Sequence, residues 1–357
     1  MNAGTAPSRG GSNRKLLVLD DQGVIAHHRS SELPSLLSSG DLVVANDAAT
    51  LPASLHGTHV RSGAAIEVRL AGHLSRGFGD VRQFMAVVFG AGDYRTPTEH
   101  RPEPPHLRGG DQIHLGSLRA TIVAVHQHPR LVSVRFDHSI EEVWEGLARR
   151  GRPIQYAYVQ GPLAIWDTWT SIAGLPAAFE APSAGFILDW AMLRTFRSRG
   201  VQFATLTHAA GISSTGDDEL DRLLPFDEAY VIPERTAALV QRTKECGGRV
   251  IAVGTTVVRA LEGAGEGGRV IGGPGVATGR IGSRITLKIV DAIVSGVHEP
   301  GTSHYELLRA FQNDEHLQQM AAIAAAHDYR IHEFGDSVFI ANVPSSRLKA
   351  EATRQVA

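Results

Sequence analysis

The sequence predicts an α/β protein in which a discontinuous α/β domain is interrupted by a small β-barrel-like domain. Strand and helix patterns alternate before residue 60 and again after residue 140. Between these limits, short strands follow one another across Gly- and Pro-rich turns without helical spacing, which is typical of a barrel or sandwich. We therefore expect an α/β domain of residues 15–59 and 141–345, an inserted domain of residues 60–140 and a disordered tail of residues 1–14.

The composition is that of a globular protein, with 43% hydrophobic and 20% charged residues in a chain of 357. The formal net charge of −2 gives no global sign of a nucleic-acid binder. Cys246 is the only cysteine, which excludes an internal disulfide and a cysteine-cluster metal site, and we expect it to pack. The first fourteen residues lack the apolar segment of a signal peptide, and no apolar run is long enough to cross a bilayer. We therefore expect a cytoplasmic protein.

Before residue 60, two polar residues follow a buried strand. The predicted elements are a hairpin, a short helix and this strand, over Lys15–Asp20 with Val24–His27, Ser30–Leu37 and Leu42–Ala45. Asn46 and Asp47 come directly after the strand, where α/β sheets commonly bind ligands. Both side chains are therefore candidates for substrate binding.

The inserted domain is predicted from five strands, several of which alternate apolar and polar residues: Ala65–Leu70, Gln83–Phe89, Gln112–Leu115, Arg119–His126 and Leu131–Phe136. His126 and His128 face the same way at a strand end. No third ligand lies nearby, so we interpret them as surface residues and predict no metal site.

After residue 140, helix and strand patterns alternate again. Helices are expected over Ser139–Arg149, Leu188–Arg199, Pro233–Cys246, Ser303–Phe311 and Leu317–His327, and strands over Phe203–Leu206, Leu287–Val294 and Ser337–Ala341. The first turn of the fourth helix carries a capping box that starts at Ser303. The glycine-rich stretch Gly263–Gly279 does not open a helix after a strand, so we predict a loop there rather than a dinucleotide-binding motif.

The most informative single feature is the corner at Gly254. Arg249–Val253 is a short apolar run expected to form a buried strand, and Gly254 permits a tight turn. Thr255 or Thr256 is expected to cap the helix that follows. The N-terminus of a helix presents free N–H groups and a positive dipole end, and Arg259 adds a cation. The corner is therefore a candidate seat for an anionic group, although an ordinary βα connection has the same pattern.

Five segments resemble motifs of the S-adenosylmethionine:tRNA ribosyltransferase-isomerase family of queuosine biosynthesis, in the same order. Residues 40–53 resemble the family's GDLLVxNxTRVIPARL, residues 181–185 its APTAG and residues 253–262 its VGTTxVRxLE. Residues 290–300 and 329–336 are similar to its VVDALxTNFHLP and YRFFSYGDA. The resemblance covers nearly the whole chain from Lys15 to Ile340. The family's fold, a discontinuous α/β domain with an inserted β-barrel, agrees with the layout above.

Several positions depart from the family's motifs. Residues 48–50 replace its TRV, and Ser54 replaces a second arginine, so two basic contacts are lost. The histidine of its LHVG is shifted by one position to His208, and of its HxxHSE only the acid remains, as Glu228. These departures indicate a divergent member.

The resemblance implies that the chain uses S-adenosylmethionine as a ribosyl donor, takes no separate cofactor, and releases adenine and methionine. The implied acceptor is 7-aminomethyl-7-deazaguanine in tRNA, and the implied product is epoxyqueuosine. The sulfonium acidifies the neighbouring C5′ hydrogen, so the site needs a base. It also needs a partner for the methionine carboxylate and a dry pocket.

The catalytic residues implied by the resemblance are His298, Glu228 and Asp336. His298, in a loop after a strand, is the leading base, and Glu228 is the second base candidate. Asp336 and Asp291 are expected to orient His298 or to pair with Arg259, and a structural salt bridge fits each of them equally well.

Donor binding is assigned to two segments. The corner formed by Gly254, Thr255, Thr256 and Arg259 is expected to hold the donor's carboxylate or its ribosyl oxygens. Ser183 and Gly185 stand where small residues would let the backbone approach the ligand.

Three hypotheses of function stay open at this point. The first is the family reaction on tRNA, and the second is an S-adenosylmethionine-using enzyme that acts on a small nucleoside or another acceptor. The lost arginine, histidine and aromatic positions motivate the second, because tRNA requires phosphate and base contacts. The third is a non-catalytic binding protein that keeps the fold. No membrane association is expected.

Overall fold

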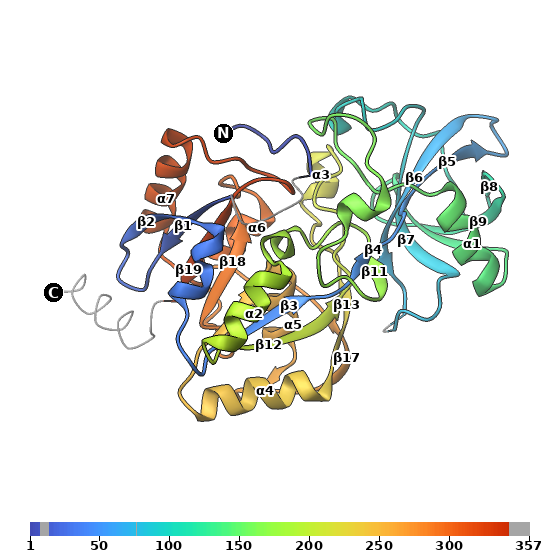
Figure 1. The fold of residues 1–357 in the computed structure, drawn as a ribbon. Helices are drawn as coiled ribbons and strands as arrows, with labels where there is room; N and C mark the ends of the chain where they lie inside the picture. The colour runs from blue at the N-terminus through green and yellow to red at the C-terminus, as the bar shows by residue number, and fades with distance from the viewer. Residues whose placement is uncertain (8–13, 76, 343–357) are drawn as a thin grey trace.

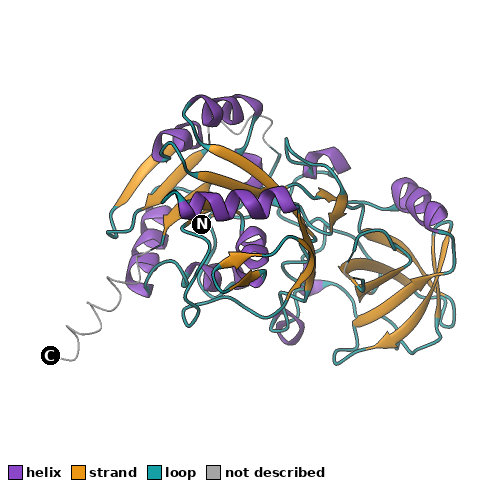
Figure 2. Cartoon of the chain, turned by 90° about the horizontal axis from the view of Figure 1, so that it is seen from below, coloured by secondary structure: helices purple, strands orange, loops and turns teal. Residues whose placement is uncertain are grey.

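The chain folds into a helix-covered sheet with a closed barrel beside it (Figure 1). A computed structural model describes residues 1–7, 14–75 and 77–342. Figure 2 shows that the barrel lies to one side of the sheet and its helices. The predicted fold class, an α/β domain with an inserted small β-barrel, is confirmed.

The main sheet has nine strands in the order β17-β13-β12-β3-β14-β18-β19-β1-β2. They are β1 (Lys15–Leu19), β2 (Ile25–Arg29), β3 (Leu42–Asn46), β12 (Gln202–His208), β13 (Glu228–Ile232), β14 (Val250–Val253), β17 (Gly273–Ala277), β18 (Ala292–Gly296) and β19 (Ser337–Ala341). The central strands β12, β3, β14 and β18 are parallel to their neighbours within this group. Their carboxyl ends therefore meet at one edge of the sheet.

Helices cover both faces of this sheet because side chains alternate along each strand. Leu42 and Val44 of β3 pack with α4 (Glu234–Glu245), α5 (Thr255–Gly263), α6 (Ser303–Leu308) and α7 (Asp314–Ala326). Val43 and Ala45 pack on the other face with the 3₁₀ helix η2 (Ser30–Leu36) and with α2 (Trp190–Ser198). A strand buried on both faces has a continuous apolar sequence, which is why β3 was recognisable.

The barrel closes in the strand order β10-β7-β6-β5-β8-β9. Its strands are β5 (Ser54–His59), β6 (Ala65–His73), β7 (Gln83–Phe89), β8 (Gln112–Leu115), β9 (Leu118–Val125) and β10 (Leu131–Phe136). β5 was missed because its sequence, SLHGTH, has few apolar residues. The barrel thus begins at Ser54, before the expected boundary at residue 60. The division into domains at the stated bounds stays a prediction.

Short elements lie in the remaining connections of the chain. The helix α1 (Ile140–Arg150) follows the barrel and is capped by Ser139. The others are β4 (Ala49–Thr50), β11 (Pro176–Ala178), β15 (Gly265–Glu266), β16 (Arg269–Val270), α3 (Asp218–Asp221) and the 3₁₀ helices η3 (Thr98–His100), η4 (Ile165–Thr168) and η5 (Ser183–Ile187). None of the described helices is long and apolar enough to span a membrane.

Three local predictions are wrong. The stretch Gly263–Gly279 contains β17, which pairs with β13, since Gly275 leaves room for the ring of Tyr230. Cys246 is exposed because it follows the last turn of α4 rather than its buried face. The cap of α6 is Thr302, whose hydroxyl accepts a hydrogen bond from the Tyr305 N–H, and not Ser303.

The predicted disordered tail also differs from the structure over its first residues. Residues 8–13 lie outside the described residues. Ala3 pairs with Ile331, and the Gly4 N–H donates to the Ile331 carbonyl at 2.9 Å. Small residues permit this contact, because a Cβ at Gly4 would lie 2.5 Å from the Phe334 carbonyl carbon.

Candidate active site

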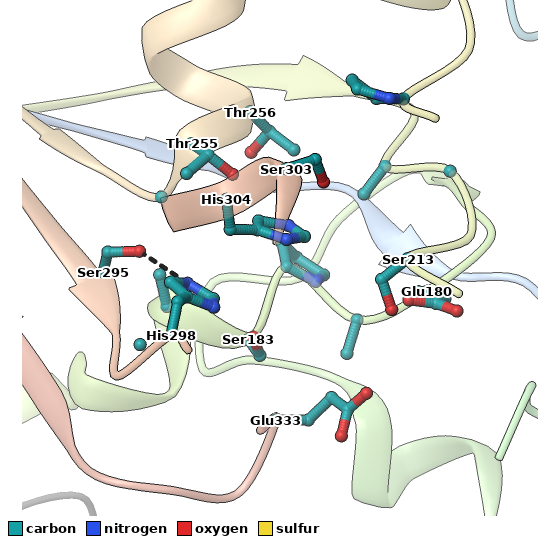
Figure 3. Close-up of a pocket in the computed structure, with 18 of the residues that line it drawn as sticks. Glu180, Ser183, Ser213, Thr255, Thr256, Ser295, His298, Ser303, His304 and Glu333 are labelled. Atoms are coloured by element: carbon teal, nitrogen blue, oxygen red, sulfur yellow. Dashed lines mark hydrogen bonds between the residues drawn. The ribbon is translucent and has the colours of Figure 1, made fainter. Parts of the chain in front are cut away.

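A cavity lies where the central parallel strands end (Figure 3). Its wall is built from the end of β14, the loop after β18, the loop after β12, the turn at 180–184 and the start of α6. Ligands of α/β sheets commonly bind at this edge. The structure therefore brings the APTAG-like and VGTT-like segments to one cavity.

Gly254 turns the chain sharply from β14 into α5. Its φ of 99° and ψ of 152° belong to a region that is almost exclusive to glycine. Gly254 itself is the N-cap, without a side-chain cap from Thr255 or Thr256, so that prediction is wrong. The backbone N–H groups of both threonines have no backbone partner in the described part of the chain. They and the helix dipole favour an anion at the cavity wall.

Arg259 is buried against Glu228 rather than extended toward solvent. The two side chains form an ion pair, and each is only 6% exposed. The Arg259 Nη2 group also donates to the carbonyls of Phe226, Ala277 and Gly279 at 3.2, 2.9 and 3.2 Å. Of the Arg259 guanidinium nitrogens, only Nε has no hydrogen-bond partner among the described residues. Most of this guanidinium therefore holds the fold together.

Glu228 has a second neighbour in His208. Its Oε1 accepts from the Gly211 N–H at 2.6 Å, and its Oε2 lies 3.7 Å from the His208 Nε2. Burial raises the pKa of Glu228, while Arg259 lowers it. Burial and Arg259 together hold the pKa of His208 well below its usual value. His208, which lies one position from the histidine of the family's LHVG motif, is thus neutral and faces Glu228.

His298 lies in the cavity beside Ser295 and His304 (Figure 3). Its Nε2 and the Ser295 Oγ are 3.0 Å apart, and its ring stacks on His304 with centroids 4.7 Å apart. Burial holds the pKa of His298 well below its usual value, and burial lowers that of His304 to about 4. Both rings are neutral at neutral pH, so each can accept a proton. The assignment of His298 as a base stays a prediction.

Asp336 and Asp291 have structural partners rather than His298 or Arg259, and for Asp291 the alternative of a structural salt bridge is confirmed. Asp336 accepts from the backbone N–H groups of Lys15 and Arg330, both at 2.9 Å. Asp291 pairs with Lys244 at 2.8 Å and accepts from the Val250 N–H at 2.8 Å. Both carboxylates therefore fix strand ends and loops.

Asn46 and Asp47 do not line the cavity either. The Asn46 amide exchanges two hydrogen bonds of 2.9 Å with the backbone of His208, and Asp47 accepts from the Thr207 hydroxyl at 2.6 Å. Both tie β3 to β12. Ser183 lines the cavity, whereas the closest contact of a Cβ at Gly185 would be Thr170, at 3.0 Å.

Two further carboxyl groups line the cavity, and sequence reasoning missed them. Glu180 accepts a hydrogen bond from the Tyr156 hydroxyl, and Glu333 accepts one from the Tyr158 hydroxyl. The tyrosine rings stack on each other, with centroids 5.8 Å apart. The only sequence signal was an acid directly before the APTAG-like segment, and an acid where the YRFFSYGDA motif has serine.

The departures that suggested lost tRNA contacts lie inside the protein. Ala48, Ala49 and Thr50 are buried. Ser54 is buried too, and its hydroxyl donates to the Glu67 Oε1 at 2.7 Å. These positions do not face a surface that a tRNA could contact, so they no longer favour a small acceptor over tRNA.

No group of three or more His, Cys, Asp or Glu side chains is arranged to hold a metal ion in the part of the chain that the structure describes. His126 instead contacts the Ser133 hydroxyl at 2.7 Å. His128 is buried and lies 3.3 Å from Asp217, so it is not the surface residue that we expected.

Comparison with known proteins gives a consistent result. A family model described as queuosine biosynthesis protein matches residues 2–340. A Thermosynechococcus vestitus protein named S-adenosylmethionine:tRNA ribosyltransferase-isomerase is 31% identical over 92% of this chain and 89% of its own length. A Thiobacillus denitrificans protein of the same name is 31% identical, covering 91% and 90%. A crystal structure of a Thermotoga maritima S-adenosylmethionine tRNA ribosyltransferase matches with a TM-score of 0.50 and 22% identity, covering 94% and 95%.

Proposed function

This chain belongs to the queuosine biosynthesis protein family, and from that premise we propose that it transfers and isomerises the ribosyl group of S-adenosylmethionine onto tRNA. The acceptor is 7-aminomethyl-7-deazaguanine in the tRNA, and the product is epoxyqueuosine. S-adenosylmethionine is a co-substrate, and adenine and methionine leave. The reaction takes place in the cytoplasm.

The observation that carries this proposal is the cavity shared by two motif segments. Gly254–Thr256 and Ser183 come from distant parts of the sequence, and both line it. In the proposed complex, the N–H groups at the start of α5 and the unpartnered Arg259 Nε–H hold the donor's carboxylate. His298 then faces the donor as a neutral base.

The proposed chemistry begins with a proton leaving C5′ of the sulfonium. Loss of adenine gives an unsaturated sulfonium, to which the acceptor amine adds. Epoxide closure then expels methionine. A neutral imidazole can take the C5′ proton, because the depressed pKa of His298 keeps its ring unprotonated.

The test is to measure adenine and methionine release from S-adenosylmethionine with tRNA that carries the aminomethyl base. Unmodified tRNA of the same sequence is the matched control. Release with the modified tRNA alone supports the proposal. The absence of release with both tRNAs, together with no binding of S-adenosylmethionine by calorimetry, would remove it. A His298→Ala protein that turned over at the wild-type rate would remove histidine from the mechanism.

No observation favours a small-nucleoside acceptor or a non-catalytic binding protein. The first was motivated by lost arginine, histidine and aromatic positions. The replaced arginine positions, residues 48–50 and Ser54, are buried, and so is the shifted histidine, His208. The second was motivated by lost histidines, yet His298, His304 and His332 all line the cavity.

A further inference from the structure

Glu180 is a carboxyl group in the cavity wall without a cationic partner. It is 9% exposed, and no Lys, Arg or His of the described chain lies within ion-pair distance of it. Figure 3 shows Glu180 and Glu333 on the side of the cavity away from Ser295 and His298. Buried carboxylates are normally paired with a cation, and Glu180 has none in the described part of the chain.

The orientation of Glu180 is fixed from behind by an aromatic stack. The Tyr156 hydroxyl donates to its carboxylate and is 3.4 Å from the Ser213 hydroxyl. The Tyr158 ring lies between Tyr156 and His332, with centroids 5.8 and 4.3 Å away. The carboxyl group is thus held in one position, as a proton-transfer group must be.

The barrel supports this stack with a charge. The Arg69 guanidinium of β6 lies 5.8 Å from the Tyr156 ring and pairs with Glu67 at 2.8 Å. It is 2% exposed and cannot reach solvent. The barrel therefore contributes to the environment of Glu180 through Tyr156, although the side chain of Glu180 belongs to the other domain.

The pKa of Glu180 lies close to neutral pH, which suits a base for a different proton from the one assigned to His298. Burial and then the neighbouring Glu333 raise the pKa of Glu180 to about 7, while hydrogen bonds from Tyr156 and Ser213 lower it. The pKa of His298 is far lower, and Glu228 is paired with Arg259. General bases work best when their pKa is near the working pH.

We propose that Glu180 is the general base that takes a proton from the primary ammonium of the acceptor, and that Glu333 is the second carboxylate that attracts this cation. The proposal rests on the proposed function. The N–H bond of the ammonium breaks, its proton moves to the Glu180 carboxylate, and the freed lone pair forms the bond to carbon. No oxidant or reductant is needed.

The position of Glu333 supports a role specific to this chain. It stands where the YRFFSYGDA motif quoted above has serine, and its neighbour His332 stands where the motif has phenylalanine. Glu333 and His332 both line the cavity, and His332 stacks on Tyr158. The divergent residues are thus found around the proposed base.

The test uses Glu180→Gln in the full-length protein, with Glu234→Gln at the exposed start of α4 as the matched control. With aminomethyl-tRNA, we expect kcat of Glu180→Gln to fall by about 10²- to 10⁴-fold, and its rise between pH 6 and pH 8 to disappear. The control keeps the wild-type rate and profile. An unchanged kcat and pH profile in Glu180→Gln would overturn the proposal.

The binding of S-adenosylmethionine separates the two possible sources of the ammonium. Calorimetry is expected to give Glu180→Gln the same Kd for S-adenosylmethionine as the wild type within about twofold, because the acceptor supplies the cation. A tenfold or larger loss of donor affinity would assign the carboxylate to the donor's own ammonium and overturn the proposal.

A direct titration distinguishes failure of this inference from failure of the proposed function. The Glu180 carboxyl is followed by ¹³C NMR of glutamate-labelled protein, assigned with Glu180→Gln, with and without methylammonium chloride. We expect methylammonium to lower its pKa, because a bound cation favours the carboxylate. If wild type is inactive on tRNA but this shift is present, the tRNA reaction is refuted and the ammonium-binding base stands. If the shift is absent, the base is refuted whatever the activity.

Discussion

Replacing Arg259 with methionine removes the cation that faces Glu228 and keeps most of the side-chain volume. Both residues are 6% exposed, so the lost partner leaves a carboxylate without a counter-charge inside the protein. Breaking a buried pair in this way costs about 3–5 kcal/mol. Three backbone carbonyls lose their hydrogen-bond donor as well. We expect Arg259→Met to lower the free energy of unfolding by about this amount.

The loss should depend on pH. Burial already raises the pKa of Glu228 above the ordinary value of 4.5, and Arg259 opposes that rise, so its removal raises the pKa further. A folded-state pKa above the unfolded value means that the folded protein binds more protons, and stability falls as pH rises between the two values. The deficit of Arg259→Met should therefore be larger at pH 8 than at pH 5.

Urea unfolding followed by tryptophan fluorescence measures this deficit. The matched variant is the double replacement Arg259→Met with Glu228→Gln, which removes both charges and retains an acceptor for the Gly211 N–H. We expect it to recover at least half of the lost free energy. A single variant as stable as the wild type at pH 8 would refute the structural role of Arg259. If that variant also failed to bind S-adenosylmethionine, only the proposed contact with the donor's carboxylate would remain.

Replacements of Gly254, Asp336 and Tyr156 test the backbone corner, the buried carboxylate and the aromatic stack. Gly254→Ala should lower the free energy of unfolding by about 1–3 kcal/mol, because alanine cannot adopt this backbone conformation without strain, and urea unfolding at wild-type stability would contradict it. Asp336→Asn should lower the free energy of unfolding by about 1–3 kcal/mol in the same assay and leave the Kd for S-adenosylmethionine, measured by calorimetry, unchanged. A large loss of affinity would show instead that Asp336 contributes to ligand binding. Tyr156→Phe removes a hydrogen bond that lowers the pKa of Glu180, so the rise of kcat with pH should move above pH 7. An unchanged pH profile would show that Tyr156 does not set the pKa of the catalytic base.

Local patterns were sufficient for most of the fold. Most strands with continuous or alternating apolar residues were placed correctly, and β7, β8, β10 and β19 have the predicted bounds. The strand expected over Leu287–Val294 is wrong in its bounds, since β18 begins only at Ala292. Such patterns indicate which side chains are buried, because apolar residues recur with a different period along a strand than along a helix. β5 and β17 were missed, since their small and polar residues form strands only when neighbouring strands supply partners. β13 was missed as well, although its sequence EAYVI is largely apolar.

The donor side of the candidate site was partly predictable from sequence as well. Gly254 and Ser183 were identified in short motifs, and both line the cavity. The need for glycine at a strand-to-helix corner comes from the local backbone conformation, and local requirements of this kind can be inferred from sequence.

The partners of charged side chains were decided by the tertiary structure alone. The sequence left open whether Asp291 and Asp336 serve His298 or Arg259 or form structural salt bridges. The fold pairs Asp291 with Lys244 and places Asp336 against backbone N–H groups. The only local sign of Glu180 was its place directly before the APTAG-like segment, because the burial that raises its pKa and the tyrosine that orients it come from distant segments. The sequence by itself determined the strands, the helices and the glycine corner, since each depends on residues close in the chain. Burial and Coulomb interactions depend on three-dimensional distance, and only packing sets that distance.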